Sequence, residues 1–85
     1  MIPTVEKLEE VAKSLGATGM SFEAFGSKAY AFIDFDTLED RRAAEREMYV
    51  VHDFVISPRY GNYGHGKVIP TAQVRVRKRK NMRGC

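Results

Sequence analysis

Residues 28–35 read Lys-Ala-Tyr-Ala-Phe-Ile-Asp-Phe, and this octamer constrains the fold more than any other segment of the chain. Side chains of a β-strand point alternately to the two faces of a sheet, so a strand here has two different faces. The apolar face, suited to a hydrophobic core, carries Ala29, Ala31, Ile33 and Phe35. The other face carries Lys28, Tyr30, Phe32 and Asp34. Two aromatic rings beside a lysine can stack nucleic-acid bases and attract a phosphate; the alternative is a hairpin strand whose rings are covered by another element.

The octamer resembles the signature of the RNA-recognition motif family, K/R-G-F/Y-G/A-F-V-x-F/Y. It departs from that signature at Ala29, where the family has glycine, and conservatively at Ile33. The resemblance implies that Tyr30 and Phe32 each stack on a base, or contact base and sugar, while Lys28 meets a phosphate.

A helix is expected directly after the octamer, to about residue 48. Thr37 is a suitable N-cap, and Asp40 stands three residues later, in a position like that of a capping box. Leu38, Ala44 and Met48 are expected to share one apolar stripe. A strand followed by this kind of helix resembles the third strand and second helix of the same family.

The remaining elements follow from apolar periodicity and turn residues. We expect a helix from Thr4 to about Leu15, strands at 18–25, 49–57 and 68–79, and a loop at 58–67. The predicted fold is α+β, with the ferredoxin-like or RNA-recognition-motif-like order α-β-β-α-β-β. It has a four-stranded, mainly antiparallel sheet with two helices on one face. Residues 1–79 form the single predicted domain, and residues 80–85 form a basic C-terminal tail.

The order of elements differs from that of the family, which runs strand, helix, strand, strand, helix, strand. The first strand is missing here, and a strand near 72–79 is left over at the other end. We therefore expect a circular permutation in which residues 72–77 fill the vacant central place, antiparallel to 49–57 and parallel to 28–35. The alternative is a fragment that lacks the first strand and exposes its core.

The charges are unevenly distributed along the 85 residues. Residues 1–57 hold six Lys and Arg and all eleven Asp and Glu, a balance of −5, whereas residues 58–85 hold eight Lys and Arg and no acid, a balance of +8. Such asymmetry favours a polyanionic partner. We expect this partner to be single-stranded RNA, with single-stranded DNA as a close alternative. An anionic membrane is a rival partner. In a further alternative, the basic segment binds no partner and only makes the chain more soluble.

The predicted contacts come from the octamer, the loop and the C-terminal segment. They are Lys28, Tyr30, Phe32, Arg59, Tyr60, Tyr63, Gln73, Arg75, Arg77, Lys78, Arg79 and Lys80. Alternation places Gln73, Arg75 and Arg77 beside the aromatic residues, where the family has a further aromatic; arginine can stack and bind phosphate instead. In the alternative reading, Arg75 or Arg77 forms a salt bridge with Asp34, and the loop is only a connector.

Little in the sequence points to catalysis. His52 lies in an apolar run, and two histidines with Cys85 give no metal-ligand spacing. We expect no enzyme activity, no metal and no cofactor. A lone cysteine suits an intracellular, reducing compartment such as cytoplasm or nucleus, and no stretch is apolar enough to span a bilayer. We expect a monomer; the second hypothesis for function is a protein-interaction module.

Overall fold

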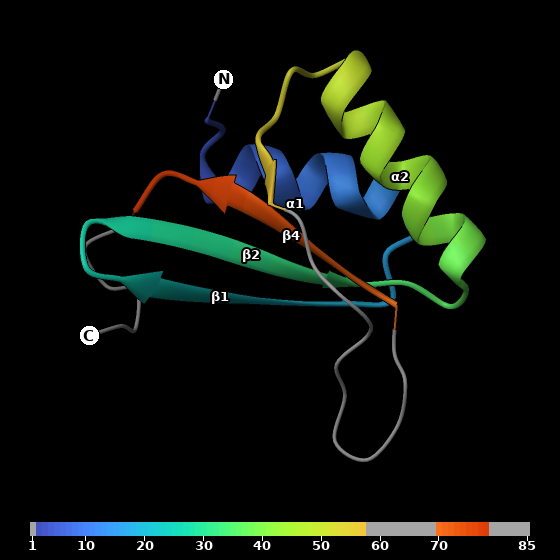
Figure 1. Cartoon of the computed structure of the whole chain (residues 1–85), viewed down its shortest axis with the longest axis horizontal. Coiled ribbons are helices and arrows are strands. Elements are labelled where there is room, and N and C mark those ends of the chain that lie inside the picture. Colours follow the sequence, from blue (N-terminus) through green and yellow to red (C-terminus); the bar gives the residue numbers. More distant parts are fainter. Residues whose placement is uncertain (1, 58–69, 79–85) are drawn as a thin grey trace.

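The computed structural model describes residues 2–57 and 70–78, and this part of the chain forms an α+β fold (Figure 1). Its elements are α1 (Val5–Ser14), β1 (Gly19–Phe25), β2 (Lys28–Asp34), α2 (Leu38–Val50), β3 (Ile56–Ser57) and β4 (Thr71–Val76). The α+β class and the order α-β-β-α-β-β are confirmed. The predicted contacts Arg59, Tyr60, Tyr63, Arg79 and Lys80 lie outside the described residues.

Helix α1 has the ends that its sequence predicts. The Thr4 side chain accepts a hydrogen bond from the backbone N–H of Lys7 at 3.2 Å, which satisfies one of the free donors of the first turn. After the helix, Gly16 has a φ of 90°, a left-handed conformation that glycine adopts without steric cost. The side chains that α1 buries are Val5, Leu8, Val11 and Ala12.

Helix α2 is capped as predicted, since the Thr37 hydroxyl accepts from the backbone N–H of Asp40 at 3.0 Å. Ala44 and Met48 are buried, but Leu38 is 37% exposed, so its expected place on the apolar stripe is wrong. Six residues separate Leu38 from Ala44, which is about one and two-thirds helical turns, and the two side chains therefore point in different directions.

The segment expected as a strand at 49–57 is mostly not a strand. Residues 49 and 50 complete α2, and the strand there is β3, with two residues in the described part of the chain. Asp53 has a φ of 58° and reverses the chain, while the backbone N–H of Phe54 donates to the carbonyl oxygen of Met48 at 2.9 Å. The β-branched residues that suggested a strand are overridden by continuation of the helix past buried Met48.

The four strands form one sheet in the order β1-β2-β4-β3. The predicted central place is confirmed for residues 72–76, because β4 lies between β2 and β3, whereas residue 77 lies past the end of the strand. The predicted parallel pairing with the octamer is wrong: β4 is antiparallel to both neighbours, and β1 pairs antiparallel with β2. Helix α2 returns the chain to the end of the sheet where β2 begins, so β3 runs in the direction of β2. A strand antiparallel to β3 is then also antiparallel to β2.

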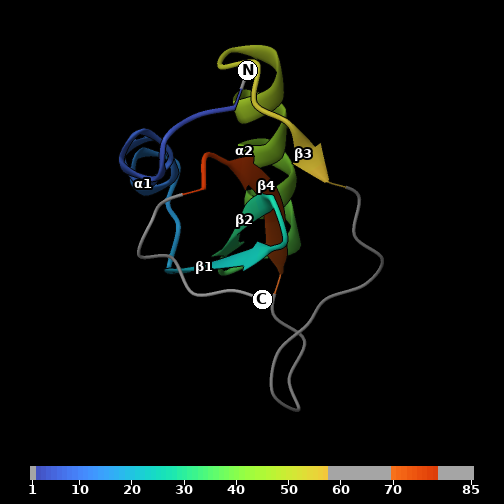
Figure 2. The same ribbon diagram turned by 90° about the vertical axis from the view of Figure 1, so that its left-hand side faces the viewer.

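Both helices lie on the same side of the sheet (Figures 1 and 2). Their buried side chains form one cluster with Ala29, Ala31, Ile33 and Phe35, and with Ala72, Val74 and Val76. The apolar face predicted for the octamer is therefore confirmed. None of the described helices is long and apolar enough to cross a membrane.

Candidate nucleic-acid interface

The sheet surface turned away from the two helices is the candidate interface, and we call it the open face. Strand alternation and the observed register assign it Ser21, Glu23, Phe25, Lys28, Tyr30, Phe32, Asp34, Gln73 and Arg75. Lys28 is exposed, whereas Tyr30 and Phe32 are half-buried, as are Gln73 and Arg75. The octamer thus presents its aromatic side chains on the face that the described helices leave uncovered.

The register between the two central strands brings predicted contacts into pairs. Tyr30 lies directly opposite Arg75, and Phe32 lies directly opposite Gln73. Residues that face each other in this way on antiparallel strands have neighbouring side chains. The prediction that Gln73 and Arg75 share a face with the two aromatic rings is confirmed.

Phe25 is an open-face aromatic residue that the sequence interpretation missed. Its side chain is 47% exposed, and its ring centroid lies 6.0 Å from that of Tyr30, with the planes tilted by 52°. Phe25 and Lys28 are paired across the two-residue turn that joins β1 to β2. The sequence does predict the turn at residues 26–27. A two-residue turn pairs the residues on either side of it, so this turn places Phe25 opposite Lys28, the first residue of the octamer.

Arg75 has a polar atom without a hydrogen-bond partner among the described residues. Its Nε is buried and makes no hydrogen bond to any residue that the structure describes. A buried donor without an acceptor costs free energy, so this position carries an uncompensated polar group. The guanidinium plane also offers a surface on which a base can stack.

Asp34 occupies the other end of the open face. It lies opposite Thr71, whose hydroxyl donates to the Asp34 carboxylate at 3.0 Å. Four residues along β2 separate Asp34 from Tyr30, the partner of Arg75, a distance of about 13 Å along a strand. The alternative of an Asp34–Arg75 salt bridge is therefore wrong, because the register keeps the two side chains apart.

Positive charge gathers at the end of the sheet near the β1–β2 turn. Lys28 begins β2 there, and the Lys78 ammonium donates to the carbonyl oxygen of Gly26 at 2.6 Å. Arg75 belongs to the second residue pair between β2 and β4 from that end. Exposed Glu23, opposite Tyr30 on β1, bounds this positive region on one side.

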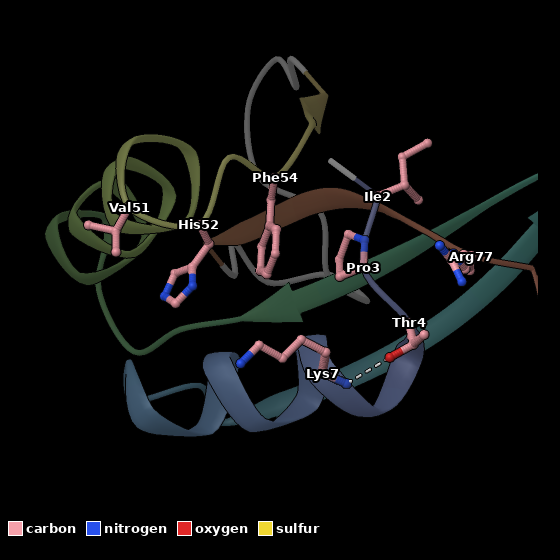
Figure 3. A pocket seen from close by; sticks show the side chains of 8 residues that line it. All are labelled: Ile2, Pro3, Thr4, Lys7, Val51, His52, Phe54 and Arg77. Carbon is pink, nitrogen blue, oxygen red and sulfur yellow. Dashed lines mark hydrogen bonds between the residues drawn. The ribbon is translucent and has the colours of Figure 1, made fainter.

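Arg77 departs from the predicted arrangement. Strand β4 ends at Val76, and the backbone N–H of Arg77 donates to the carbonyl oxygen of Pro3 at 2.8 Å. This contact draws the chain toward the start of α1, and the Arg77 side chain lines a pocket together with Thr4, the N-cap of that helix, and Lys7 in its first turn (Figure 3). The prediction that Arg77 lies on the open face with Arg75 is therefore wrong.

Chemistry of other kinds has little geometric support in the described residues. No group of three or more His, Cys, Asp and Glu side chains among them could hold a metal ion. His52 is half-buried and stacks on Phe54, with ring centroids 5.2 Å apart.

Comparisons of this chain with protein-family models, with curated proteins and with solved structures find no match.

Proposed function

We propose that this chain is a single-stranded RNA-binding domain that uses the open face, and that it is a circularly permuted member of the RNA-recognition motif family. The strand order supports the second part. In that family the first strand lies in the centre of the sheet, beside the fourth. Counting β4 as the first strand gives the family's order, since β4 lies between β2 and β3.

The observation that carries the functional proposal is the position of Tyr30 between Phe25 and Arg75 on a face that the described helices leave open. Aromatic rings and guanidinium planes stack on bases of any sequence, and each stacked base is worth about 1–3 kcal/mol. Phe32, one strand repeat away from Tyr30, supplies the ring for a neighbouring base. The open face thus offers a short row of flat side chains along which a single strand can lie.

The charges give the bound strand a preferred position. Lys28, Arg75 and Lys78 stand near the β1–β2 turn, and Asp34 stands at the opposite end. Phosphates are therefore favoured near the turn and disfavoured near Asp34. Because arginine replaces the aromatic residue that the family has on the central strand, we expect affinity to depend more on salt than on base sequence.

A binding titration with matched variants tests the proposal. Fluorescence anisotropy of labelled octamers of U, A or C, as RNA and as DNA, is measured at two salt concentrations. Wild-type affinity for RNA should fall as salt rises, and Lys28→Gln should reduce the log–log salt slope by about 0.7, the value for one phosphate contact on a single strand. Lys13→Gln removes an exposed lysine from α1, on the helix side, and should leave the slope unchanged. Equal effects of both substitutions, or no binding, would contradict the proposal.

A protein partner is the second candidate, and it rests on a different surface. Four exposed apolar side chains lie at the end of α2 and just after it: Tyr49, Val50, Val51 and Val55. Large exposed apolar side chains near one another are typical of protein contacts. Under the RNA proposal, Val50→Ser leaves RNA affinity unchanged; under the alternative, the chain shows no salt-dependent RNA binding at all.

A further inference from the structure

The Asp34 carboxylate lies on the open face, at the end away from the β1–β2 turn, and it is held in one orientation. Asp34 is the last residue of β2, the strand that lies between β1 and β4 (Figure 1). Its side chain is half-buried. The carboxylate oxygen Oδ1 accepts a hydrogen bond from the hydroxyl of buried Thr71 at 3.0 Å, so the group is fixed from the β4 side.

The other carboxylate oxygen, Oδ2, keeps its capacity to accept hydrogen bonds. It accepts none from the residues that the structure describes, and it is not buried. Gly19 lies opposite Asp34 on β1, and a β-carbon at that position would stand 3.2 Å from Oδ2. Because glycine has no side chain, this oxygen is left uncovered by Gly19. A carboxylate oxygen has two acceptor sites, so Oδ1 also retains one beside its bond to Thr71.

Asp34 stands next to an aromatic residue of the open face. Phe32 lies two residues earlier on the same strand and the same face, about 7 Å away along β2. A base that stacks on the Phe32 ring therefore brings one edge toward the carboxylate. Phosphates are favoured near Lys28 and Lys78 at the opposite end, so the group that faces Asp34 is a base edge and not a phosphate.

We propose that Asp34 recognises a guanine of the bound strand, an inference that rests on the RNA-binding proposal. The Watson–Crick edge of guanine presents two adjacent donors, N1–H and the 2-amino group, and a carboxylate presents two acceptor oxygens. Uracil has one N–H between two carbonyl oxygens, and adenine and cytosine each have an amino group beside a ring nitrogen that accepts. Each of these bases would turn an acceptor toward a carboxylate oxygen. Base preference is thus confined to this one position, while salt dependence governs the rest of the strand.

Anisotropy titration of the full 85-residue chain tests the proposal with labelled octauridylate and with octamers that carry one G, A, C or inosine at the fourth position. Wild type should bind the G octamer about tenfold more tightly than octauridylate, the gain expected from one bidentate contact to a base. The A and C octamers should bind like octauridylate. Inosine lacks the 2-amino group and should lose most of the gain.

Two variants separate recognition by Asp34 from a general effect of charge. Asp34→Asn keeps an acceptor for the Thr71 hydroxyl but replaces one carboxylate oxygen by an amide donor, so it should bind all the octamers alike. Glu23→Gln is the matched control, because it removes an exposed carboxylate from the same face, opposite Tyr30 on β1. It should keep the guanine preference. A melting curve of each variant measures its folding.

The possible failures of the two proposals differ. Equal wild-type affinity for the G octamer and octauridylate, an equal gain from A or C, or a guanine preference that survives Asp34→Asn would overturn the role of Asp34 and leave RNA binding standing. If Asp34→Asn does not fold, the wild-type comparison of guanine with inosine decides, since equal affinity means that the 2-amino group is not read. No binding of wild type to any octamer would overturn both proposals.

Discussion

Tyr30 and Arg75 lie directly opposite each other on the two central strands of the sheet, and the buried Nε of Arg75 has no hydrogen-bond partner among the described residues. A phenol ring and a guanidinium plane are thus neighbours on a surface that the described helices leave open. The backbone pairing makes these two residues neighbours, since a slip of one strand by one residue would turn its member of the pair to the core. The pair is the centre of the proposed RNA contact.

Removing either central ring should weaken RNA binding with little loss of stability. Tyr30→Ala and Phe32→Ala should each cost about 1–3 kcal/mol of binding free energy, because each removes the support of one base. Both side chains are half-buried on the open face rather than in the core, so thermal unfolding should change modestly. Anisotropy titration and a melting curve of each variant measure the two effects.

Ile33→Ala is the control for the opposite face. Ile33 is fully buried among helix residues, so its truncation should cost about 2–5 kcal/mol of unfolding free energy. RNA affinity of the fraction that stays folded should be unchanged. If Tyr30→Ala unfolds the domain and spares binding, the two faces have been assigned the wrong roles.

The chemistry of Arg75 is tested by two substitutions. Arg75→Gln removes the charge and should lower the salt slope by about 0.7 as well as the affinity. Arg75→Lys keeps the charge but loses the planar group, so the slope should persist while affinity still falls. An Arg75→Lys variant that binds like wild type would show that only charge matters at this position.

Phe25 should contribute to binding although it lies outside the octamer. Its ring is 47% exposed and contacts Tyr30, so Phe25→Ala should reduce RNA affinity while barely changing stability. Tyr49→Ala, which removes a 64% exposed ring from α2, is the matched control and should have no effect on RNA. Equal losses for the two variants would point to nonspecific aromatic contacts.

The sequence predicted those parts of the fold that depend on local signals. Alternation in the octamer identified the buried face of Ile33, and Thr37 identified the start of α2. The strand order could also be predicted. The central place of the family's first strand was empty in this chain, and the C-terminal strand was the element left to fill it. These signals are set by side-chain period and capping, which act over a few residues.

The errors arose where tertiary geometry decides. The direction of β4 depends on the path of α2 across the sheet, which no local pattern reports. The position of Arg77 depends on a backbone hydrogen bond to Pro3, 74 residues away in the chain. Residues 49–57 have strand-like composition, yet the helix continues because Met48 is anchored in the core.

The raised pKa of Glu45 should make the stability of the fold depend on pH. Burial raises the pKa of its carboxyl above the usual value, although the nearby Arg41 and Arg42 act in the opposite direction. The folded chain therefore holds this proton more tightly than the unfolded chain, and stability falls as pH rises from the usual glutamate pKa through the raised one. Because other carboxyl groups titrate in the same range, the effect of Glu45 is isolated by the difference in unfolding free energy between Glu45→Gln and wild type.

Urea unfolding of both proteins between about pH 4 and 7 measures that difference. The unfolding free energy of Glu45→Gln minus that of wild type should increase with pH and then level off above the raised pKa. A difference that decreases with pH would mean that the ion pair with Arg41, at 3.8 Å, outweighs the cost of burial.

The central claim is that RNA bases stack on the open face, and intermolecular nuclear Overhauser contacts test it most directly. With a short single-stranded RNA bound to the isotope-labelled chain, ring protons of Tyr30 and Phe32 should show contacts to base and ribose protons. The Tyr49 ring, on α2, should show none. Contacts that involve Tyr49, or the pocket residue Phe54, with no contact to Tyr30 or Phe32 would contradict the account.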